Sequence, residues 1–494
     1  MPHVLLVGEG AREHALALML ARSPEEPRIS AVMKRVNPGI ARAASATSGR
    51  LYIADTASPE AVARAAEEAS PDLVVIGPEE PLFAGVADAL RDRGFTVYGP
   101  DAELARIEMD KAYARSLMWR HRIPGRLRFK AFRDPREAAA YARQAGDVVV
   151  KPARQAGGSG VRVFSEPYEH LAGAARETAS GYAAALADKM REKYGSLEHV
   201  ILVEERVDGV EYTVMAVTDG AAVVPLPAVQ DHPHAYPLDV GPETGGMGAI
   251  AGPCRTLPFI TEREYRETVD ILESTVRALS RETGRPYVGT LSGQMMLTGL
   301  WGPTLIEYYS RFGDPETGAL IYLVESSFFE LLDRAASRRL PGYRLRLSCD
   351  TYVVVKAAAP AGYPLDRGMA RGHPVAVDES VARENGCVVL YGGVEQRSDG
   401  TLVSTGSRLV EVVCPSRRGF EEASRRAERV LATVRLLDGH PLFHRWDIGS
   451  RELLAQRTEA ARLARIAYTR RREKGLTSIY DWVPGRGLII HDYS

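Results

Sequence analysis

The stretch Leu305–Glu316 reads LIEYYSRFGDPE, and it predicts a short apolar strand that runs into a turn crowded with charge. The period of two along a strand places Leu305, Glu307 and Tyr309 on one face. A carboxylate inside an apolar strand is costly unless it is paired or binds a cation. Glu307 is therefore a candidate ligand of a metal ion.

The charged turn of this stretch carries Arg311, Asp314 and Glu316. Such charge density on a loop directly after a strand favours a functional site over a structural cluster of ion pairs. Residues 291–297 predict a neighbouring strand that holds Gln294. The side-chain oxygens of Gln294 and Glu307 suit Mg²⁺ that arrives bound to phosphates.

Two lysines and a glycine-rich loop upstream favour a phosphate site. Lys111 in MDKAY and Lys151 in VVVKPA stand out because the chain is poor in lysine and rich in arginine. As compact point charges they suit nucleotide phosphates. The loop 153–161 contains Gly157, Gly158, Ser159 and Gly160, and such a loop folds over a triphosphate and donates backbone hydrogen bonds. Taken alone, surface lysines and a hairpin turn are the simpler interpretation.

Glu204 and Glu211 flank a turn, at the end of one predicted strand and the start of the next. A hinge of this kind offers its backbone to an adenine edge and its second carboxylate to ribose hydroxyls. Glutamates on either side of a hairpin are common, so this pair is weak evidence by itself.

The first hundred residues predict a doubly wound parallel sheet, because short apolar strands alternate with helices. The predicted strands are 3–7, 73–76 and 96–98, and the predicted helices are 12–21 and 84–92. The turns Gly8–Ala15 (GEGAREHA) and Gly77–Leu82 (GPEEPL) follow two of these strands and should face one crevice. Their glycines allow a phosphate to approach a helix N-terminus. A tight turn without a ligand is the alternative.

The rest of the chain predicts a long polar loop, several helices and a further unit. The loop is expected at Gln230–Gly248 and a helix at Thr261–Glu282. The further unit begins near Ser337 and ends in a helix whose apolar residues recur at helical spacing over 420–434. A charged helix, Arg451–Glu473, opens the final segment.

The composition, with 494 residues, 45% of them hydrophobic and 26% charged, is typical of a globular protein of several domains. The net charge of −1 argues against nucleic acid and anionic membranes as partners. No apolar run suits a bilayer span or a secretory signal. The four cysteines are far apart and form no CxxC pair, which predicts neither zinc nor disulfides and suits a reducing cytoplasm.

Taken together, the motifs resemble those of glycinamide ribonucleotide synthetase, a family of the ATP-grasp superfamily. The collinear motifs are GEGAREHA, GPEEPL, MDKAY, VVVKPA, VEERVDGVEYT, QDH, DVGPETGGMGA, IEYYSRFGDPET, KAAAPAGYP, STGSRLVEV and HRWDIG. The combination of TGGMG with RFGDPE is specific, the resemblance extends to about Gly449, and HAYPLDVGPETGGMG resembles the archaeal form.

The resemblance implies an α/β and α+β multidomain fold. A parallel-sheet N-domain (1–103) precedes an ATP-grasp core (104–335) with a mobile lid at about 123–196. A C-terminal mixed α/β domain (336–440) and an extension without an assigned role (441–494) follow. The implied reaction, in purine biosynthesis, joins glycine to 5-phosphoribosylamine through glycyl phosphate. It uses ATP and Mg²⁺, with Mn²⁺ as the alternative metal, in a cytoplasmic monomer or weak homo-oligomer.

Carried over residue by residue, the resemblance assigns roles to the candidates. Arg311, Lys151 and Asp231 would be catalytic. The ATP site would comprise Lys111, Lys151, Gly157, Gly158, Ser159, Gly160, Glu204 and Glu211. The substrate site would comprise Gly8, Gly10, Gly77, Pro78, Glu79, Asp231, Thr244, Gly245, Gly246, Met247, Gly248, Arg311, Gly313 and Asp314. The metal site would comprise Gln294, Glu307 and the position of Tyr309.

Three positions depart from the family pattern. Ser159 stands where a loop lysine is usual, which should cost about 1.5–3 kcal/mol of phosphate binding, and Arg154 is the hypothetical substitute. Tyr309 stands where asparagine would bind the second magnesium ion, and a neutral phenol is a poor ligand. Glu243 replaces another asparagine and is a candidate for a compensating carboxylate.

Two other functions are weighed against this one. An ATP-grasp ligase with a different amino acid or amine is disfavoured by TGGMG and the N-terminal turns. A nucleotide-binding protein without ligase activity is disfavoured by Glu307, Arg311 and the two lysines.

Overall fold

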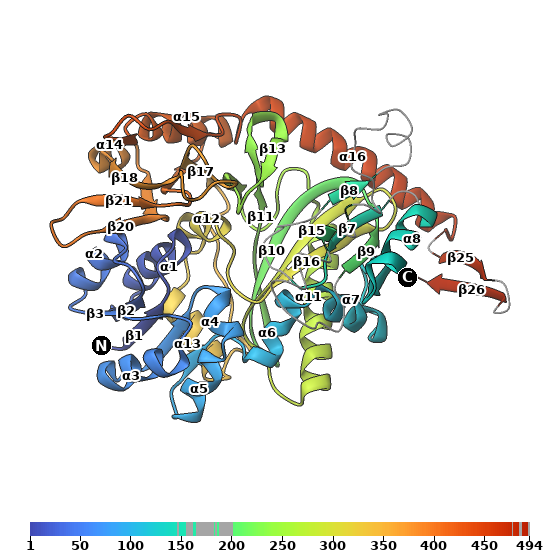
Figure 1. Cartoon of the computed structure of the whole chain (residues 1–494), viewed down its shortest axis with the longest axis horizontal. Helices are drawn as coiled ribbons and strands as arrows, with labels where there is room; N and C mark the ends of the chain where they lie inside the picture. Colours follow the sequence, from blue (N-terminus) through green and yellow to red (C-terminus); the bar gives the residue numbers. More distant parts are fainter. Residues whose placement is uncertain are drawn as a thin grey trace. The chain divides into compact units, whose positions relative to one another are not determined.

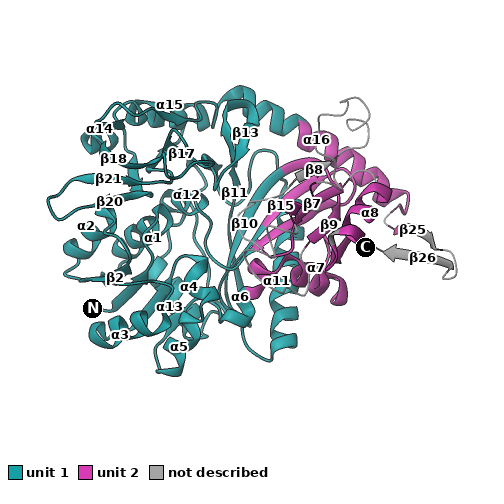
Figure 2. Ribbon diagram, viewed as in Figure 1, with its two compact units in different colours: residues 1–105, 211–293, 309–459 teal, residues 106–210, 294–308, 460–494 magenta. Residues whose placement is uncertain are grey.

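The computed structural model describes residues 1–145, 148–154, 162–164, 182, 185–186, 201–476, 478–483 and 487–492. The chain forms two compact units (Figure 2). Unit 1 comprises residues 1–105, 211–293 and 309–459, and unit 2 comprises 106–210, 294–308 and 460–494. The four-part division expected from the sequence stays a prediction. The predicted loop residues Gly157, Gly158, Ser159 and Gly160 lie outside the described residues.

Unit 1 begins with a five-stranded parallel sheet in the order β3-β2-β1-β4-β5 (Figure 1). Its strands are β1 His3–Val7, β2 Arg28–Met33, β3 Leu51–Ile53, β4 Leu73–Ile76 and β5 Val97–Tyr98. The helices are α1 Ala11–Ala21, α2 Pro38–Ala46, α3 Pro59–Ala69, α4 Glu79–Phe83 and α5 Val86–Asp92. Val4 and Leu6 join one hydrophobic cluster, and Leu5 and Val7 join another. Alternate residues thus face two covered sides, which confirms the predicted doubly wound sheet.

A second sheet, most of which lies in unit 1, runs in the order β15-β10-β11-β14-β17-β22-β19, with β24 beside β17, and the first two residues of β10 and the last five of β15 belong to unit 2. Its strands are β10 Gly209–Asp219, β11 Val223–Asp231, β14 Gly248–Ala251, β15 Val288–Thr298, β17 Tyr352–Pro360, β19 Val388–Tyr391, β22 Val410–Ser416 and β24 Leu442–His444. Helix α12, Glu316–Leu323, contacts α1 as well as β11, β14 and β17. Because α12 starts where the RFGDPE motif ends, this packing fixes that turn beside the N-terminal sheet.

The remaining elements of unit 1 lie at its periphery. A small sheet has the order β20-β21-β18-β23, with β18 Arg371–Ala376, β20 Val394–Gln396, β21 Leu402–Thr405 and β23 Arg435–Leu436. The helices are α11 Glu262–Thr283, α13 Phe328–Ala336, α14 Glu379–Glu384 and α15 Phe420–Leu431. Helix α11 confirms the predicted helix, and Thr261 caps it by accepting a hydrogen bond from Glu264 N.

The segment Gln230–Gly248 is not a simple loop, contrary to the sequence prediction. It contains the hairpin β12 His234–Tyr236 and β13 Val240–Glu243, joined by a 3-10 turn at Pro237–Asp239. Arg445 Nη1 donates to Asp239 Oδ1 at 2.7 Å. The strands are too short and polar to show an alternating pattern, so tertiary contacts define this hairpin.

Unit 2 contains a four-stranded sheet in the order β6-β9-β7-β8. Its strands are β6 Phe129–Phe132, β7 Val148–Pro152, β8 Arg162–Phe164 and β9 Ile201–Glu205, with helices α7 Lys111–Arg120 and α8 Pro135–Ala145. Strand β16 is Gly302–Tyr309, and β25 Ser478–Val483 pairs with β26 Gly487–Asp492. Helices α6 Ala102–Met109 and α16 Arg451–Glu473 contribute residues to both units. Within the described ranges, no helix is long and apolar enough to cross a membrane.

The prediction that the cysteines form no disulfides is wrong. Cys254 pairs with Cys349, and Cys387 pairs with Cys414. Strands β19 and β22 are antiparallel with Val388 opposite Val413, so the next pair outward brings Cys387 opposite Cys414. Spacing along the sequence could not reveal this pairing, because the cross-strand register brings the two sulfur atoms together.

Candidate active site

Three buried charged residues of unit 2 form a connected group around Glu204. Arg115 Nε donates to Glu204 Oε1 at 2.5 Å, and Arg115 Nη2 donates to Oε2 at 3.2 Å. Lys151 pairs with the same carboxylate. The guanidinium of Arg115 also donates to the carbonyl oxygens of Leu305 and Ile306, at 3.0 and 2.6 Å. The group therefore connects α7, β7, β9 and β16.

The sheet register explains why Lys151 meets Glu204. In the antiparallel pair of β7 and β9, Lys151 lies opposite Leu202, and Val149 lies opposite Glu204. Alternate residues of a strand share a face, so Lys151 and Glu204 are diagonal neighbours on one face. The VVVK and VEE motifs therefore form one charged group.

Burial and neighbouring charges shift the pKa values of this group. Burial alone raises the pKa of Glu204, but the charges of Arg115 and Lys151 outweigh it and lower the pKa to about 2. Burial lowers the pKa of Lys151 to about 8, although Glu204 opposes that change. At neutral pH Lys151 is therefore mostly charged, as phosphate binding requires. The adenine contact expected of Glu204 stays a prediction.

A second ion pair of unit 2 joins the other candidate lysine to the candidate metal ligand. Lys111 is the first residue of α7, which Asp110 caps, and its Nζ pairs with Glu307 of β16. Gln294 is buried on the neighbouring strand β15. Carboxylate and amide oxygens fit Mg²⁺, whereas the neutral phenol of Tyr309 does not. The described residues contain no group of three or more His, Cys, Asp or Glu that would hold an ion alone.

The two glycine turns of unit 1 meet at one side chain. A Cβ atom on Gly8 would lie 2.5 Å from Glu13 Cγ, and one on Gly77 would lie 2.3 Å from Glu13 Oε1. Glu13 Oε2 accepts a hydrogen bond from Gly10 N at 2.7 Å. The turns therefore converge as expected, and Glu13 occupies the space that a third glycine would leave open. Pro78 lies at the same junction, with its Cδ 2.8 Å from the Cβ position of Gly8.

Arg311 lies beside the second glycine turn. Its Nε donates to Glu79 Oε2 at 3.2 Å, and its guanidinium carbon lies 4.6 Å from the ring centroid of Tyr309. Arg12 Nη1 lies 3.7 Å from Glu79 Oε2. Burial raises the pKa of Glu79, but Arg311 and Arg12 outweigh it and lower the pKa. Glu79 therefore stays a carboxylate that holds both cations.

Arg408 joins the two most specific motifs. Its Nη1 donates to the carbonyl oxygens of Gly245 and Gly246 at 3.1 and 2.7 Å, and its Nη2 donates to Asp314 Oδ1 at 2.7 Å. Gly246 has a φ of +104°, and a Cβ atom there would lie 2.6 Å from Pro315 Cδ. Glycine is needed at this position because TGGMG packs directly on the RFGDPE turn.

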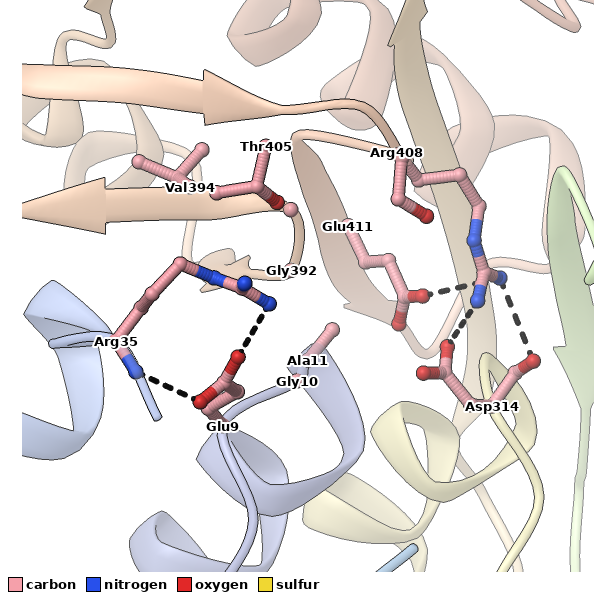
Figure 3. A pocket seen from close by; sticks show the side chains of 12 residues that line it. Glu9, Gly10, Ala11, Arg35, Asp314, Gly392, Val394, Thr405, Arg408 and Glu411 are labelled. Atoms are coloured by element: carbon pink, nitrogen blue, oxygen red, sulfur yellow. Dashed lines mark hydrogen bonds and ion pairs between the residues drawn. The ribbon is translucent and has the colours of Figure 1, made fainter. Parts of the chain in front are cut away.

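A pocket of about 180 Å³ opens between the N-terminal turn and this cluster. Figure 3 shows Glu9 and Arg35 on one side and Arg408, Asp314 and Glu411 on the other. Arg35 Nη2 donates to Glu9 Oε1 at 2.6 Å. The lining residues are Glu9, Gly10, Ala11, Arg35, Asp314, Gly392, Gly393, Val394, Thr405, Ser407, Arg408 and Glu411. Glycine backbones, hydroxyls and two arginines suit a phosphorylated polyhydroxy ligand.

A buried carboxyl, Glu316, interacts with the partly buried carboxylate of Asp231. Burial and the Asp231 carboxylate raise the pKa of Glu316 to about 7, and Thr213 Oγ1 donates to Glu316 Oε1 at 3.4 Å. Gly313 leaves room for Glu316, whose Cδ would lie 2.5 Å from a Cβ at that glycine.

The two glutamates that flank the predicted nucleotide hinge belong to different units. Glu211 lies on β10 in unit 1, whereas Glu204 lies on β9 in unit 2.

The loop Thr244–Gly248 is held by hydrogen bonds within itself and to the preceding residues His232 and Pro233. Thr244 Oγ1 donates to Pro233 O at 2.7 Å and accepts from Gly246 N at 3.0 Å. Met247 is fully buried, and its N–H donates to His232 O at 2.7 Å. The loop is therefore a rigid wall rather than a free segment.

Several residues of the site were missed from the sequence. Arg115 and Arg12 resemble the many other arginines of the chain, and only their burial distinguishes them. Arg408 lies in the quoted motif STGSRLVEV, so the position of an arginine just before an apolar strand was an available signal. Arg35 and Gly392 carried no motif that predicted a site.

Models of known protein families match most of the chain. Models of phosphoribosylglycinamide synthetase match in three parts: the N domain at residues 2–108, the ATP-grasp (A) domain at 109–317 and the C domain at 353–451. A phosphoribosylamine–glycine ligase from Methanopyrus kandleri is 41% identical over 468 residues, which cover 94% of this chain and 99% of the relative. One from Methanothermobacter thermautotrophicus is 39% identical and covers 92% and 98%.

Solved structures give the same result for the fold. The crystal structure of a phosphoribosylamine–glycine ligase from Thermotoga maritima matches with a TM-score of 0.70 at 25% identity, covering 90% of this chain and 99% of that one. A biotin carboxylase domain from Hydrogenobacter thermophilus matches with a TM-score of 0.66 at 15% identity, covering 94% and 98%. The latter likeness concerns the fold alone.

Proposed function

The chain belongs to the phosphoribosylglycinamide synthetase family, and from that premise we propose how its two units divide the work of the reaction. The reaction joins glycine to 5-phosphoribosylamine and converts ATP to ADP and phosphate. The product, glycinamide ribonucleotide, belongs to purine biosynthesis. The expected fold and the expected ATP-dependent ligase activity are thus both confirmed.

Activation by ATP follows from the chemistry of the acid. A carboxylate does not accept an amine directly, because oxide is a very poor leaving group. Transfer of the γ-phosphoryl group to glycine gives glycyl phosphate, from which phosphate leaves when the amine attacks the acyl carbon. Glycyl phosphate is sensitive to water, so the site must exclude solvent while it exists.

Unit 2 holds the nucleotide in this proposal. Lys151 and Lys111 supply positive charge to the phosphates, and Arg115 keeps the Glu204 carboxylate charged and in place. Lys111 exchanges its partner Glu307 for a phosphate oxygen, since the same carboxylate is a candidate metal ligand. The loop residues Gly157, Gly158, Ser159 and Gly160, with Arg154 at their start, would cover the phosphates.

A divalent metal accompanies ATP in the ATP-grasp fold. We propose Mg²⁺, with Mn²⁺ able to replace it, held by Glu307, Gln294 and phosphate oxygens. The metal would neutralise charge that develops on the transferring phosphoryl group. Tyr309 supplies no ligand in this proposal.

Unit 1 binds the other two substrates in this proposal. The phosphoribosyl group occupies the pocket lined by Gly10, Arg35 and Ser407, and Arg408 and Asp314 fix its far wall. Glycine binds beside Asp231 and the Thr244–Gly248 loop. Arg311, held by Glu79, faces the transferring phosphoryl group.

One observation carries the proposal. A single strand and turn, LIEYYSRFGDPE, holds the candidate metal ligand Glu307 of unit 2 and the Arg311 and Asp314 contacts of unit 1. Only three residues lie between Glu307 and Arg311, so the chain itself connects the nucleotide side to the substrate side.

The test is a complete reaction with ATP, Mg²⁺, glycine and freshly made phosphoribosylamine. ADP and glycinamide ribonucleotide should form in equal amounts. ADP formation that depends on another amino acid would point to a ligase of different specificity, and absence of ADP with any metal would contradict ligase activity. We further propose that the protein is cytoplasmic and is a monomer or weak homo-oligomer. Sedimentation of the purified protein would test the oligomeric state.

A further inference from the structure

Tyr309 is placed to support an arginine. The Arg311 guanidinium carbon lies 4.6 Å from the centroid of the Tyr309 ring, and both residues belong to unit 1. A guanidinium within about 6 Å of an aromatic face is attracted to the negative face of the ring. The Arg311 guanidinium therefore lies over the face of the Tyr309 ring.

The edge of the same guanidinium is held by different groups. Arg311 Nε donates to Glu79 Oε2 at 3.2 Å, and Nη1 donates to Phe312 O at 3.2 Å. Arg12 donates to the same carbonyl oxygen at 3.2 Å and lies beside Glu79. These contacts hold one side of the group, and the group can still move about them. The contact with the Tyr309 ring restricts that movement.

We propose that Tyr309 is a positioning residue, whose ring holds the Arg311 guanidinium in place for its contact with the transferring phosphoryl group. The proposal rests on the role of Arg311 in the proposed function. An arginine contributes best when its planar fork is oriented before the phosphoryl group arrives. In this proposal the aromatic ring of Tyr309, and not its phenolic hydroxyl, positions the guanidinium.

The proposal also accounts for the unusual residue at this position. An amide oxygen here would be a suitable magnesium ligand, whereas a neutral phenol is not. On strand β16, Tyr309 shares a face with Glu307, the candidate metal ligand, and it precedes Arg311 by two residues. Tyr309 thus lies between the metal ligand and the arginine along the chain, and its ring contacts the arginine.

Two substitutions separate the ring from the hydroxyl. Tyr309→Leu removes both, and Tyr309→Phe restores the ring alone. The Leu variant should lower kcat about 2- to 30-fold, the range of a cation–π contact, with KM for ATP and glycine changed less than about twofold. The Phe variant should recover most of that loss. Tyr343→Leu is the matched control, because Tyr343 also faces an arginine, Arg334, at 5.9 Å but lies outside the site.

Metal binding is measured separately, by electron paramagnetic resonance of Mn²⁺ with ADP and each protein. The Leu and Phe variants should bind Mn²⁺ as the unmodified protein does. The proposal is overturned if the Leu variant keeps full kcat, if the Phe variant is as slow as the Leu variant, or if either variant weakens Mn²⁺ binding tenfold. Failure of the unmodified protein to form glycinamide ribonucleotide would contradict the proposed function instead.

Discussion

Replacing Arg115 by methionine should destabilise unit 2 and weaken ATP binding. Arg115 and Glu204 are 3% and 2% exposed, and two hydrogen bonds join them. The variant loses two charge-assisted hydrogen bonds to a buried carboxylate, which should cost about 3–5 kcal/mol. Lys151 would then become the main partner of Glu204 and would be less available to phosphate, so ATP affinity should fall about tenfold or more.

Arg128, which directly precedes β6, provides a matched control. Its Nε lies 3.2 Å from Glu205, the residue next to Glu204, and its side chain is 39% exposed. Glu205 keeps its hydrogen bond from the backbone N–H of Arg128, so loss of the partly exposed guanidinium should cost about 0–1 kcal/mol. Arg128→Met should therefore have little effect on stability and leave ATP affinity unchanged.

The assay is urea unfolding followed by tryptophan fluorescence, with Trp119 of α7 as the reporter near Arg115, and calorimetric titration with ATP. The reasoning is refuted if Arg115→Met and Arg128→Met lose equal stability. It is also refuted if Arg115→Met costs less than about 1 kcal/mol, since a buried charge would then tolerate loss of its partner.

Three further predictions concern unit 1. The double variant Cys387→Ala/Cys414→Ala should lose up to about 3.6 kcal/mol of unfolding free energy, the chain-entropy value for its 27-residue separation; an unchanged urea midpoint would contradict this. Burial raises the pKa of Glu316 to about 7, so the folded state holds an extra proton between about pH 4.5 and 7. Stability should fall as pH rises through that window, and Glu316→Gln should weaken the dependence in unfolding measured at pH 5 and pH 7.5, whereas an unchanged dependence would contradict this. Arg408→Met should raise KM for phosphoribosylamine, because the pocket wall built on Asp314 loses its cation, and steady-state kinetics with unchanged KM would disprove that role.

Local sequence patterns predicted the elements of the fold well. Alternating strands and helices predicted the N-terminal parallel sheet, and the helices 261–282 and 451–473 lie where the pattern placed them. These features depend on short-range periodicity and capping, which the sequence displays directly. The hairpin within Gln230–Gly248 depends instead on contacts with residues distant in sequence, such as Arg445, so the local pattern did not predict it.

The site was predictable where a residue type is rare in its context. Glu307 within an apolar strand and two lysines in a lysine-poor chain stood out, and the structure pairs Glu307 with Lys111 and buries Lys151 beside Glu204. The sequence did not single out Arg115 and Arg408, because arginine is the ordinary surface cation of this chain. Burial distinguishes them, and burial is a property of the fold.

The same limit applies to the cysteines. The β19–β22 register brings Cys387 and Cys414 together, whereas Cys254 and Cys349 meet in segments outside the strands, so the separations of 27 and 95 residues predicted neither pair.

The most direct test of the central claim, phosphoryl transfer to glycine, follows the oxygen atoms of the acid. Glycine labelled with ¹⁸O in its carboxylate would be converted with ATP, Mg²⁺ and phosphoribosylamine, and the released phosphate analysed by mass spectrometry. Passage through glycyl phosphate predicts one ¹⁸O atom in each phosphate formed with glycinamide ribonucleotide. Phosphate without ¹⁸O would show that water received the phosphoryl group, and it would contradict the account.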